Sequence, residues 1–200
     1  MNSTTYREIF NQAIADYHVK DEVDQVLSNP YPADDFKSLL YQKIWIDTVQ
    51  WHLEDIIRDP NIVPEDALVI KRRIDHSNQN RTDLVERIDS YYVNKYKDVQ
   101  KKTDARMNTE SIGWALDRFA ILALKVYHMK EEANRKEASS EHQEACAKKL
   151  LILEEQSLDL GSSIDHLMED VGNGIRFTKV YHQMKMYNDP NLNPILYSQK

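Results

Sequence analysis

The chain has few residues that break helices and only one cysteine. Four glycines and six prolines among 200 residues leave long stretches that can be helical, and a hydrophobic content of 41% is enough for a sizeable core. The single cysteine, Cys146, excludes an intramolecular disulfide and a zinc site built from several cysteines. Because Cys146 falls on the apolar face of its predicted helix, we interpret it as a buried hydrophobic residue rather than a catalytic thiol.

Clusters of positive charge and long apolar segments are also missing. The chain carries 33 acidic and 26 basic residues, a net charge of −7, so we expect no binding to nucleic acids. The N-terminus has no apolar signal segment, and the most hydrophobic stretch, residues 112–129, is interrupted by charged side chains: Asp117, Arg118 and Lys125. We therefore expect a cytoplasmic protein that does not insert into membranes.

Signature motifs of common enzyme classes are absent from the sequence. It contains no His-Glu-x-x-His zinc motif, no glycine-rich phosphate loop and no Gly-x-Ser-x-Gly nucleophile elbow. Di-iron helical bundles use Glu-x-x-His on two helices, but no histidine of this chain has an acidic residue three positions before it. The reversed order occurs at His52 and Asp55, which could share a ligand on one helix flank. We expect no metal site and no cofactor, and we keep His52 and Asp55 as candidate ligand-binding residues.

Apolar residues recur at helical spacing along most of the chain. The pattern predicts five helices, at residues 5–27, 34–58, 65–97, 109–135 and 140–171, and then a short sixth helix with Phe177, Val180, Tyr181 and Met184 on one side. No alternating strand pattern is found. We thus predict an all-α protein: a single-domain helical bundle of about six helices over residues 1–187, followed by an extended C-terminal tail at residues 188–200.

Two of the predicted helices have unusual apolar surfaces. The helix at residues 109–135 is apolar on most of its circumference, which predicts a central position in the bundle. The helix at residues 34–58 carries apolar residues on two faces, with Leu40, Ile44 and Trp51 on one of them. That second helix is therefore either central as well or in contact with another chain.

Arg81 lies at the centre of the apolar stripe of the helix predicted at residues 65–97. At about 100° per residue, Arg81 falls at the centre of a set of apolar side chains that lie within roughly 60° of one another: Ala67, Ile70, Ile74, Val85, Ile88, Tyr91 and Tyr92. A buried cation is unfavourable unless it is paired, so carboxylates of neighbouring helices or a bound anion must face it. Asn78 borders Arg81 within residues 77–80, a run of poor helix formers that is our preferred site region. The pairing carboxylate remains open among four candidates: Asp117, Glu110, Glu54 and Asp55.

One line of the predicted fourth helix combines charged and titratable side chains. Glu110, Asp117 and His128 lie along it, and Arg118 flanks it. One interpretation is a ligand-binding or acid–base face, with Asp117 and His128 as candidate catalytic residues in a polar cavity shared with Arg81. The other, which we favour, is a set of internal salt bridges at the edge of a solvated face, because structural ion pairs also gather inside bundles.

Four segments of the chain resemble a bacterial family known as domain of unknown function 4254, found mainly in Bacteroidetes-type organisms. They read WIDTVQWHLEDIIRDP, ALVIKRRIDHSNQNRTDLVERID, DARMNTESIGWALDRFAILALKVYHM and VYHQMKMYNDPNLNP. The resemblance implies a small, cytoplasmic, helical protein without an established activity, and it suggests a link to cell-envelope polysaccharide synthesis. The segments contain our candidate ligand-binding residues, most of them already selected from helical spacing: Asn78, Arg81, Glu110, Trp114, Asp117, Arg118, His52 and Asp55.

Two functions fit these observations. In the first, the protein is an interaction or accessory protein whose two-faced second helix and aromatic tail, including Tyr187 and Tyr197, contact a protein partner or a second copy. In the second, it binds a small anionic metabolite, or acts on it, with Arg81 and Arg118 facing the ligand. We favour the interaction function, because the sequence shows no nucleophile paired with a base.

Overall fold

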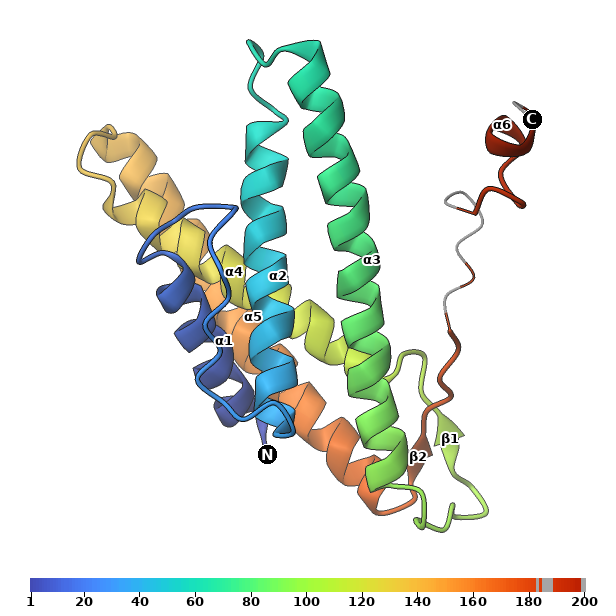
Figure 1. Ribbon diagram of the computed structural model, residues 1–200. Helices are drawn as coiled ribbons and strands as arrows, with labels where there is room; N and C mark the ends of the chain where they lie inside the picture. Colours follow the sequence, from blue (N-terminus) through green and yellow to red (C-terminus); the bar gives the residue numbers. More distant parts are fainter. Residues whose placement is uncertain (183, 185–188, 199–200) are drawn as a thin grey trace.

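The structure is a computed structural model that describes residues 1–182, 184 and 189–198 of the chain (Figure 1). It contains five long helices: α1 (Ser3–Tyr17), α2 (Phe36–Ile56), α3 (Pro64–Lys95), α4 (Ile112–Asn134) and α5 (Ser140–Gly172). One helical turn, α6 (Pro194–Tyr197), lies near the C-terminus. Two short strands, β1 (Arg106–Met107) and β2 (Arg176–Phe177), form the only sheet within the described residues. The predicted all-α bundle is confirmed.

The long helices begin where the first backbone N–H groups are satisfied or missing. Four helices start after a capping side chain that accepts a backbone hydrogen bond: Asn2 before α1, Asp35 before α2, Ser111 before α4 and Ser139 before α5. α3 starts with Pro64, which has no N–H to leave unpaired. Within the described residues, no helix is both long enough and apolar enough to cross a bilayer.

α1 is shorter than predicted and ends at Tyr17 rather than at residue 27. The backbone N–H groups of Lys20 and Asp21 both donate to the Tyr17 carbonyl, at 3.3 and 3.1 Å, and close a tight turn. Asp21 adopts a left-handed φ of 57° in this turn, which a right-handed helix cannot include. Val19 and Val26 in the following segment are exposed, so they do not supply the apolar face that a longer helix would need.

α4 is the central helix, as its apolar circumference predicted, because it contacts α1, α2, α3 and α5. One continuous apolar core surrounds it, and the largest fully buried aromatic side chains come from three helices: Tyr6, Phe10, Tyr17, Tyr41 and Phe119. The hydroxyl groups of Tyr6 and Tyr92 share a buried hydrogen bond that ties α1 to α3. Leu40 and Ile44 on α2 are fully buried, whereas Trp51 is half-buried.

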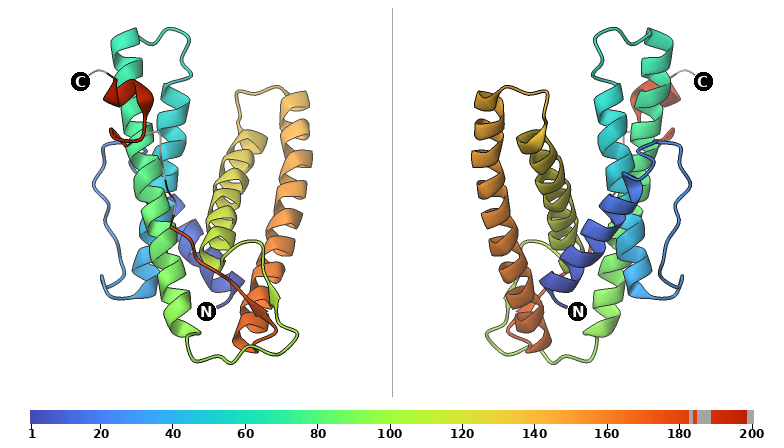
Figure 2. Two further views of the ribbon diagram at one scale, coloured as in Figure 1. Left: turned by 90° about the vertical axis from the view of Figure 1, so that its right-hand side faces the viewer. Right: turned by 90° about the vertical axis from the view of Figure 1, so that its left-hand side faces the viewer.

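The four longest helices form two hairpins, α2–α3 and α4–α5, which diverge towards their connecting loops (Figure 2). α1 packs against α2, α4 and α5, so it contacts both hairpins. Away from the connecting loops, α2, α3 and α4 all contact one another. Three of the polar residues that the sequence singled out, Asn78, Arg81 and Asp117, lie at this meeting of three helices.

The chain after α5 forms a strand where the sequence predicted a sixth helix. Gly174 adopts a left-handed φ of 68°, and a Cβ at this position would collide with the carbonyl oxygen of Gln100. The chain can therefore approach the connection between α3 and β1, and β2 pairs with β1 in parallel. Residues 178–182 have no regular secondary structure. The predicted helix with Phe177, Val180 and Tyr181 on one side is thus wrong over the described residues.

The C-terminal tail contains one turn of helix that the sequence did not predict. Asn193 caps α6 by accepting a hydrogen bond from the Ile195 N–H at 3.0 Å. Among the described elements, none contacts α6, and Ile195 and Tyr197 are largely exposed. Tyr187, which we had named as a possible contact residue, lies outside the described residues.

Candidate functional site

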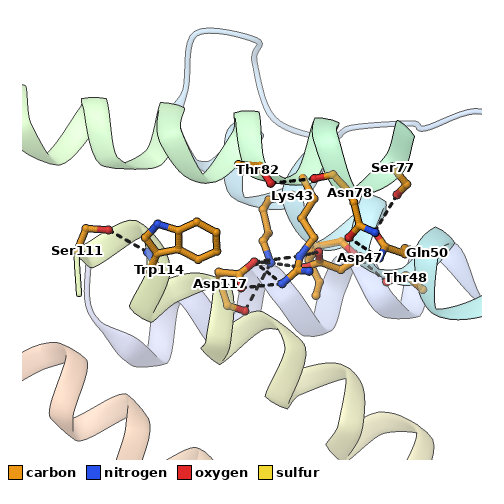
Figure 3. Close-up of polar contacts among 12 residues, drawn as sticks. Lys43, Asp47, Thr48, Gln50, Ser77, Asn78, Thr82, Ser111, Trp114 and Asp117 are labelled. Atoms are coloured by element: carbon orange, nitrogen blue, oxygen red, sulfur yellow. Dashed lines mark hydrogen bonds and ion pairs between the residues drawn. The ribbon is translucent and has the colours of Figure 1, made fainter. Parts of the chain in front are cut away.

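Four charged side chains meet where α2, α3 and α4 pack together, and we call them the ionic quartet: Lys43, Asp47, Arg81 and Asp117. Figure 3 labels three of them, Lys43, Asp47 and Asp117. Arg81 binds Asp117 in a bidentate manner, because Nη2 donates to Oδ2 at 2.7 Å and Nε donates to Oδ1 at 3.1 Å. Lys43 Nζ lies 2.7 Å from Asp117 Oδ1 and also pairs with Asp47. Arg81 Nε is 3.1 Å from Asp47 Oδ1. Each cation therefore contacts both carboxylates.

Helical spacing explains how two members of the quartet reach the core. Lys43 and Asp47 lie one turn apart on α2, on the face that also buries Leu40 and Ile44. The sequence analysis missed both charged residues. The signal that could have found them is an oppositely charged pair, four residues apart, inside an apolar stripe.

The quartet is electrically neutral and mostly buried. The Asp47 side chain is 0% exposed, whereas the Arg81 side chain is 26% exposed. Burial raises the pKa of Asp47 to about 6, and the attraction of Lys43 and Arg81 only partly offsets it. Burial also acts on Asp117, but there Lys43 and Arg81 outweigh it and hold the pKa below its usual value. Asp117 is therefore the carboxylate that stays firmly ionised.

One oxygen of Asp47 has no hydrogen bond within the described residues. Its Oδ1 is buried, and the Arg81 Nε–H group, although close in distance, does not point along a hydrogen-bond direction towards it. Arg81 therefore stabilises this oxygen mainly through its charge, at 3.1 Å from Nε. A buried carboxylate oxygen without a donor adds to the unfavourable desolvation that raises the pKa of Asp47.

The structure shows which carboxylates contact Arg81. Asp117 was one of the four candidates from the sequence, and Asp47 was not among them. The other three candidates lie elsewhere: Glu110 pairs with Arg118, Glu54 pairs with Arg58, and Asp55 lines a cavity. Arg81, the cation in the apolar stripe of α3, is therefore paired with two protein carboxylates, those of Asp47 and Asp117.

Asn78 and its neighbours join α3 to α2 beside the quartet (Figure 3). Gln50 Nε2 donates to Asn78 Oδ1 at 2.8 Å, and Ser77 Oγ donates to Gln50 Oε1 at 3.1 Å. The Thr82 hydroxyl donates to the Asn78 carbonyl at 2.9 Å. The two contacts of Gln50 join α2 to α3, and they give Ser77 and Asn78, which are poor helix formers, a structural role in α3.

Two cavities adjoin the quartet, and Arg81 and Ile121 line both. The larger cavity has a volume of about 610 Å³ and the smaller one about 370 Å³. Polar and aromatic residues in the wall of the larger cavity include Ser111, Trp114, Asp117, Arg118, Lys179 and Tyr181. Those in the wall of the smaller cavity are Asp47, Gln50, Trp51, Glu54, Asp55 and Arg58. Arg81 is therefore the cation exposed to both spaces.

His128 does not share a cavity with Asp117, so this part of the predicted site is wrong. The two residues lie on one line of α4, but eleven residues of helix separate them by about 16 Å, and His128 lines neither cavity. His128 lies instead near His52, with ring centroids 5.5 Å apart. His52 in turn contacts His18 through Nε2 atoms 3.3 Å apart, not its predicted co-ligand Asp55. His18 was not a sequence candidate, since no spacing rule connects it to α2 or α4.

One protein-family model matches most of the chain. The family model described as "Protein of unknown function (DUF4254)" matches residues 37–180, and the chain therefore belongs to this family. The matched span includes all four members of the ionic quartet. Comparisons with curated proteins and with solved structures gave no match.

Proposed function

We propose that this protein binds a small anionic metabolite in the larger cavity, against Arg81. The observation that carries the proposal is the position of this guanidinium: Asp47 and Asp117 hold it in place, while about a quarter of the side chain, 26%, is exposed. Its Nη1 has no acceptor among the described residues. A guanidinium fixed in this way can bind a phosphate or carboxylate without first being ordered.

The size and the walls of the larger cavity support this ligand class. Its volume of about 610 Å³ falls within the roughly 300–1,000 Å³ of small-molecule sites. Lys179 adds positive charge to the wall, whereas Arg118 is paired with Glu110 of the same wall. Trp114 offers a flat apolar surface on which a ring can stack. A sugar phosphate combines an anion with a ring, and it would also agree with the polysaccharide link that the family resemblance suggested.

Asp117 has a positioning role in this proposal. It contacts Arg81 through both oxygens, and the pKa that Lys43 and Arg81 hold low keeps it ionised at neutral pH. An ionised Asp117 fixes the guanidinium but has no proton to donate. The proposal is therefore one of binding and assigns no chemical step to the cavity.

Thermal unfolding with inorganic phosphate and with sugar phosphates as probes tests the binding site. Because a ligand that binds only the folded state stabilises it, Tm should rise with the concentration of the bound probe. We expect a smaller rise for Arg81→Met and for Lys179→Ala. Arg87→Met, an exposed position on the same helix, should behave like the unchanged protein.

The two site variants answer different questions. Arg81→Met removes the central guanidinium but also disturbs the quartet, whereas Lys179→Ala changes an exposed side chain that the fold does not need. Equal Tm rises in all four proteins would contradict binding at this cavity. So would the absence of any rise in the unchanged protein with every probe.

Two complementary exposed surfaces favour a second function, assembly with a second copy of the chain. The α2–α3 groove is a cavity of about 600 Å³ with an apolar floor and a basic rim: Ile46, Val49, Leu53, Val69, Arg72, Arg73 and His76. The acidic face of α5 combines exposed apolar and acidic side chains: Leu151, Ile152, Leu158, Glu154, Glu155 and Asp159. The two surfaces match in apolar character. Arg73 is paired with Asp24 of the same chain, but Arg72 is opposite in charge to the acidic residues of α5, which supports contact of the two surfaces across a dimer.

Sedimentation velocity of the purified chain tests this assembly. In a two-fold dimer each copy would offer both surfaces, so one substitution removes two contacts. Val69→Glu in the α2–α3 groove and Leu158→Glu in the acidic face of α5 should each shift the chain towards the monomer. Val93→Glu, at a similarly exposed position of α3, should leave the dimer intact. A chain that is monomeric at every concentration would contradict the proposal.

A further inference from the structure

Three histidines from three separate parts of the chain surround one point. His18 follows the last turn of α1, His52 lies in α2, and His128 lies in α4. Each pair of ring centroids is 5.3 to 5.5 Å apart, and one nitrogen of each ring lies within 4.8 Å of the others. No other cluster of potential metal ligands of this kind occurs in the described part of the chain.

The hydrogen bond of His18 directs one free nitrogen towards His52. His18 Nδ1 lies 2.7 Å from the Ile14 carbonyl oxygen, which can only accept, so Nδ1 carries the proton and Nε2 keeps its lone pair. This Nε2 is 3.3 Å from Nε2 of His52. Zinc–nitrogen bonds of about 2.0–2.1 Å in a tetrahedral site place two ligand nitrogens about 3.3–3.4 Å apart. The spacing therefore suits two ligands of one ion.

His128 supplies a third nitrogen that the protein leaves unused. Its Nε2 is buried and has no hydrogen-bond partner in the described residues. Its Nδ1 lies 3.5 Å from the Glu131 carboxylate, which favours a proton on Nδ1 and a lone pair on Nε2. A buried polar atom without a partner is unfavourable, and a bound cation would relieve that cost.

Aromatic rings hold all three imidazoles in position. Each imidazole packs against one aromatic ring: His52 against Tyr17, His128 against Trp51 and His18 against Tyr127. The interplanar angles of the first two pairs are 11° and 10°, so these rings are stacked and cannot rotate freely. Burial also lowers the pKa of His52 and His128, which favours the neutral form that binds metals.

Asp21 offers an oxygen at the open side of the cluster. Its Oδ1 lies 3.4 Å from His52 Nε2 and 3.9 Å from His18 Nε2, and its side chain is 55% exposed. The left-handed backbone at Asp21 turns the chain back after α1 and brings this carboxylate to the histidines. The three nitrogen donors thus have a carboxylate beside two of them, and that carboxylate is exposed to solvent and can approach a bound ion.

We propose that His18, His52, His128 and Asp21 bind one divalent transition-metal ion of the zinc type. Three imidazole donors select zinc and its first-row neighbours over magnesium and calcium, and the 3.3 Å between His18 Nε2 and His52 Nε2 matches the spacing of a tetrahedral zinc site. The sequence predicted no metal site, because the known motifs pair ligands that are spaced along one helix. This site is built from ligands that only the fold brings together.

Metal titration of the full chain, purified without a polyhistidine tag and freed of metal by a chelator, tests the proposal. Calorimetry with Zn²⁺ should show one equivalent bound, and Co²⁺ should give the visible absorption of a tetrahedral complex. His128→Phe should abolish both signals. His166→Phe, at an exposed position of α5, is the matched control and should bind like the unchanged protein.

Stability measurements without metal separate lost binding from lost folding. Phenylalanine at position 128 can keep the stacking on Trp51, and it removes the partnerless Nε2 together with the 3.5 Å contact between Nδ1 and the exposed Glu131 carboxylate. Because an exposed ion pair contributes little, metal-free His128→Phe should be nearly as stable as the metal-free unchanged protein. Zn²⁺ should then raise the Tm of the unchanged protein but not that of the variant. Failure of the unchanged protein to bind Zn²⁺, or equal binding by His128→Phe, would overturn the proposal.

Asp21→Asn tests the oxygen ligand without risk to the fold, because this side chain is exposed. Loss of a residue that merely orients a metal ligand costs roughly 10–100-fold in affinity, and loss of Asp21 should weaken Zn²⁺ binding at least as much. Glu22→Gln, at the next exposed position, is the control. Unchanged affinity in Asp21→Asn would remove Asp21 from the ligand set.

Discussion

Asp47 and Asp117 contact the same two cations, yet their pKa values move in opposite directions. Asp47 is completely buried and one of its oxygens lacks a hydrogen bond, so Lys43 and Arg81 replace only part of its lost hydration. Asp117 accepts three hydrogen bonds from Arg81 and is slightly more exposed. The same two cations, Lys43 and Arg81, therefore do not give Asp47 and Asp117 the same pKa.

Asp47→Asn should change how stability depends on pH between about 4 and 6. The folded-state pKa of Asp47 is about 6, above its usual 3.8, so the folded protein binds the proton first as the pH falls. Above about pH 6, protonation of Asp47 adds nothing to the free energy of unfolding. As the pH falls from about 6 to about 4, this protonation increases the free energy of unfolding. Urea unfolding at pH 7 and pH 5 should show the unchanged protein gaining about 1 kcal/mol relative to Asp47→Asn. A pH-independent difference would mean that Asp47 titrates normally.

Arg81→Met should lower the free energy of unfolding by about 3 kcal/mol, because it leaves one cation for two buried carboxylates. Adding Asp117→Leu removes the surplus negative charge and leaves Lys43 paired with Asp47. The double variant should therefore recover most of the lost stability in urea unfolding. Arg87→Met provides the surface control. A double variant less stable than Arg81→Met would contradict charge balance as the origin of the effect.

At the scale of the element, the start of α4 depends on a residue of α3. Asp89 is buried in α3 and accepts hydrogen bonds from the Gly113 N–H at 2.7 Å and the Ser111 hydroxyl at 2.6 Å. It thereby satisfies a donor in the first turn of α4 and fixes the capping serine. The close approach of the two helices is possible because Gly113 has no side chain.

Gly113→Ala should destabilise the protein by about 1–3 kcal/mol, the usual effect of overpacking. The added Cβ would lie 2.6 Å from Asp89 Oδ1 and 2.8 Å from the Val85 carbonyl oxygen, so α3 and α4 would have to separate. At Gly172 the nearest atom to an added Cβ is Tyr96 Cε1 at 3.5 Å, an ordinary contact. Gly172→Ala should therefore be neutral or slightly stabilising in the same urea experiment. Equal losses in both variants would contradict a local clash.

The five long helices could be predicted from the sequence because each buries an apolar stripe with a helical period. The errors occur where a contact distant in the sequence decides the local structure. Gly174 leads into a strand because it packs against Gln100, and the helix predicted after it has no stripe to bury. Asp21 ends the first helix through a turn whose residues have no strong stop signal.

The same distinction explains what the sequence revealed of the site. Arg81 was identified because a cation in an apolar stripe breaks a local rule. Lys43 and Asp47 could not be predicted as buried residues, because α2 is apolar on two faces and the pattern does not show which face is buried. His18 and His128 meet only in the folded chain, and no spacing rule relates them.

At the scale of the molecule, α1 joins the two diverging hairpins. The Ser3 N–H and hydroxyl donate to the Asp165 carboxylate of α5, at 2.7 and 2.6 Å, and Arg7 Nη2 donates to the Ser157 carbonyl at 3.0 Å. Phe10 is buried against Phe119 of the central helix. The N-terminal helix, which lies before the matched family span, is therefore part of the same core.

Ending the chain at residue 187 tests whether the tail belongs to this core. Since α6 contacts no other described element, its removal should change the free energy of unfolding by less than about 0.5 kcal/mol, whereas Phe10→Ala should cost about 3–5 kcal/mol. Thermal and urea unfolding compare the two. The division into a bundle at residues 1–187 and a tail at 188–200 is still a prediction, and a large loss on truncation would contradict it.

The truncated chain also separates two routes to self-assembly. A dimer that joins the α2–α3 groove to the acidic face of α5 uses no residue beyond Asp159, so truncation should leave its sedimentation unchanged. A dimer held by the exposed apolar residues of the tail, such as Ile195 and Tyr197, should dissociate. Loss of the dimer on truncation, with Leu158→Glu still dimeric, would assign assembly to the tail and leave the acidic face of α5 without a partner.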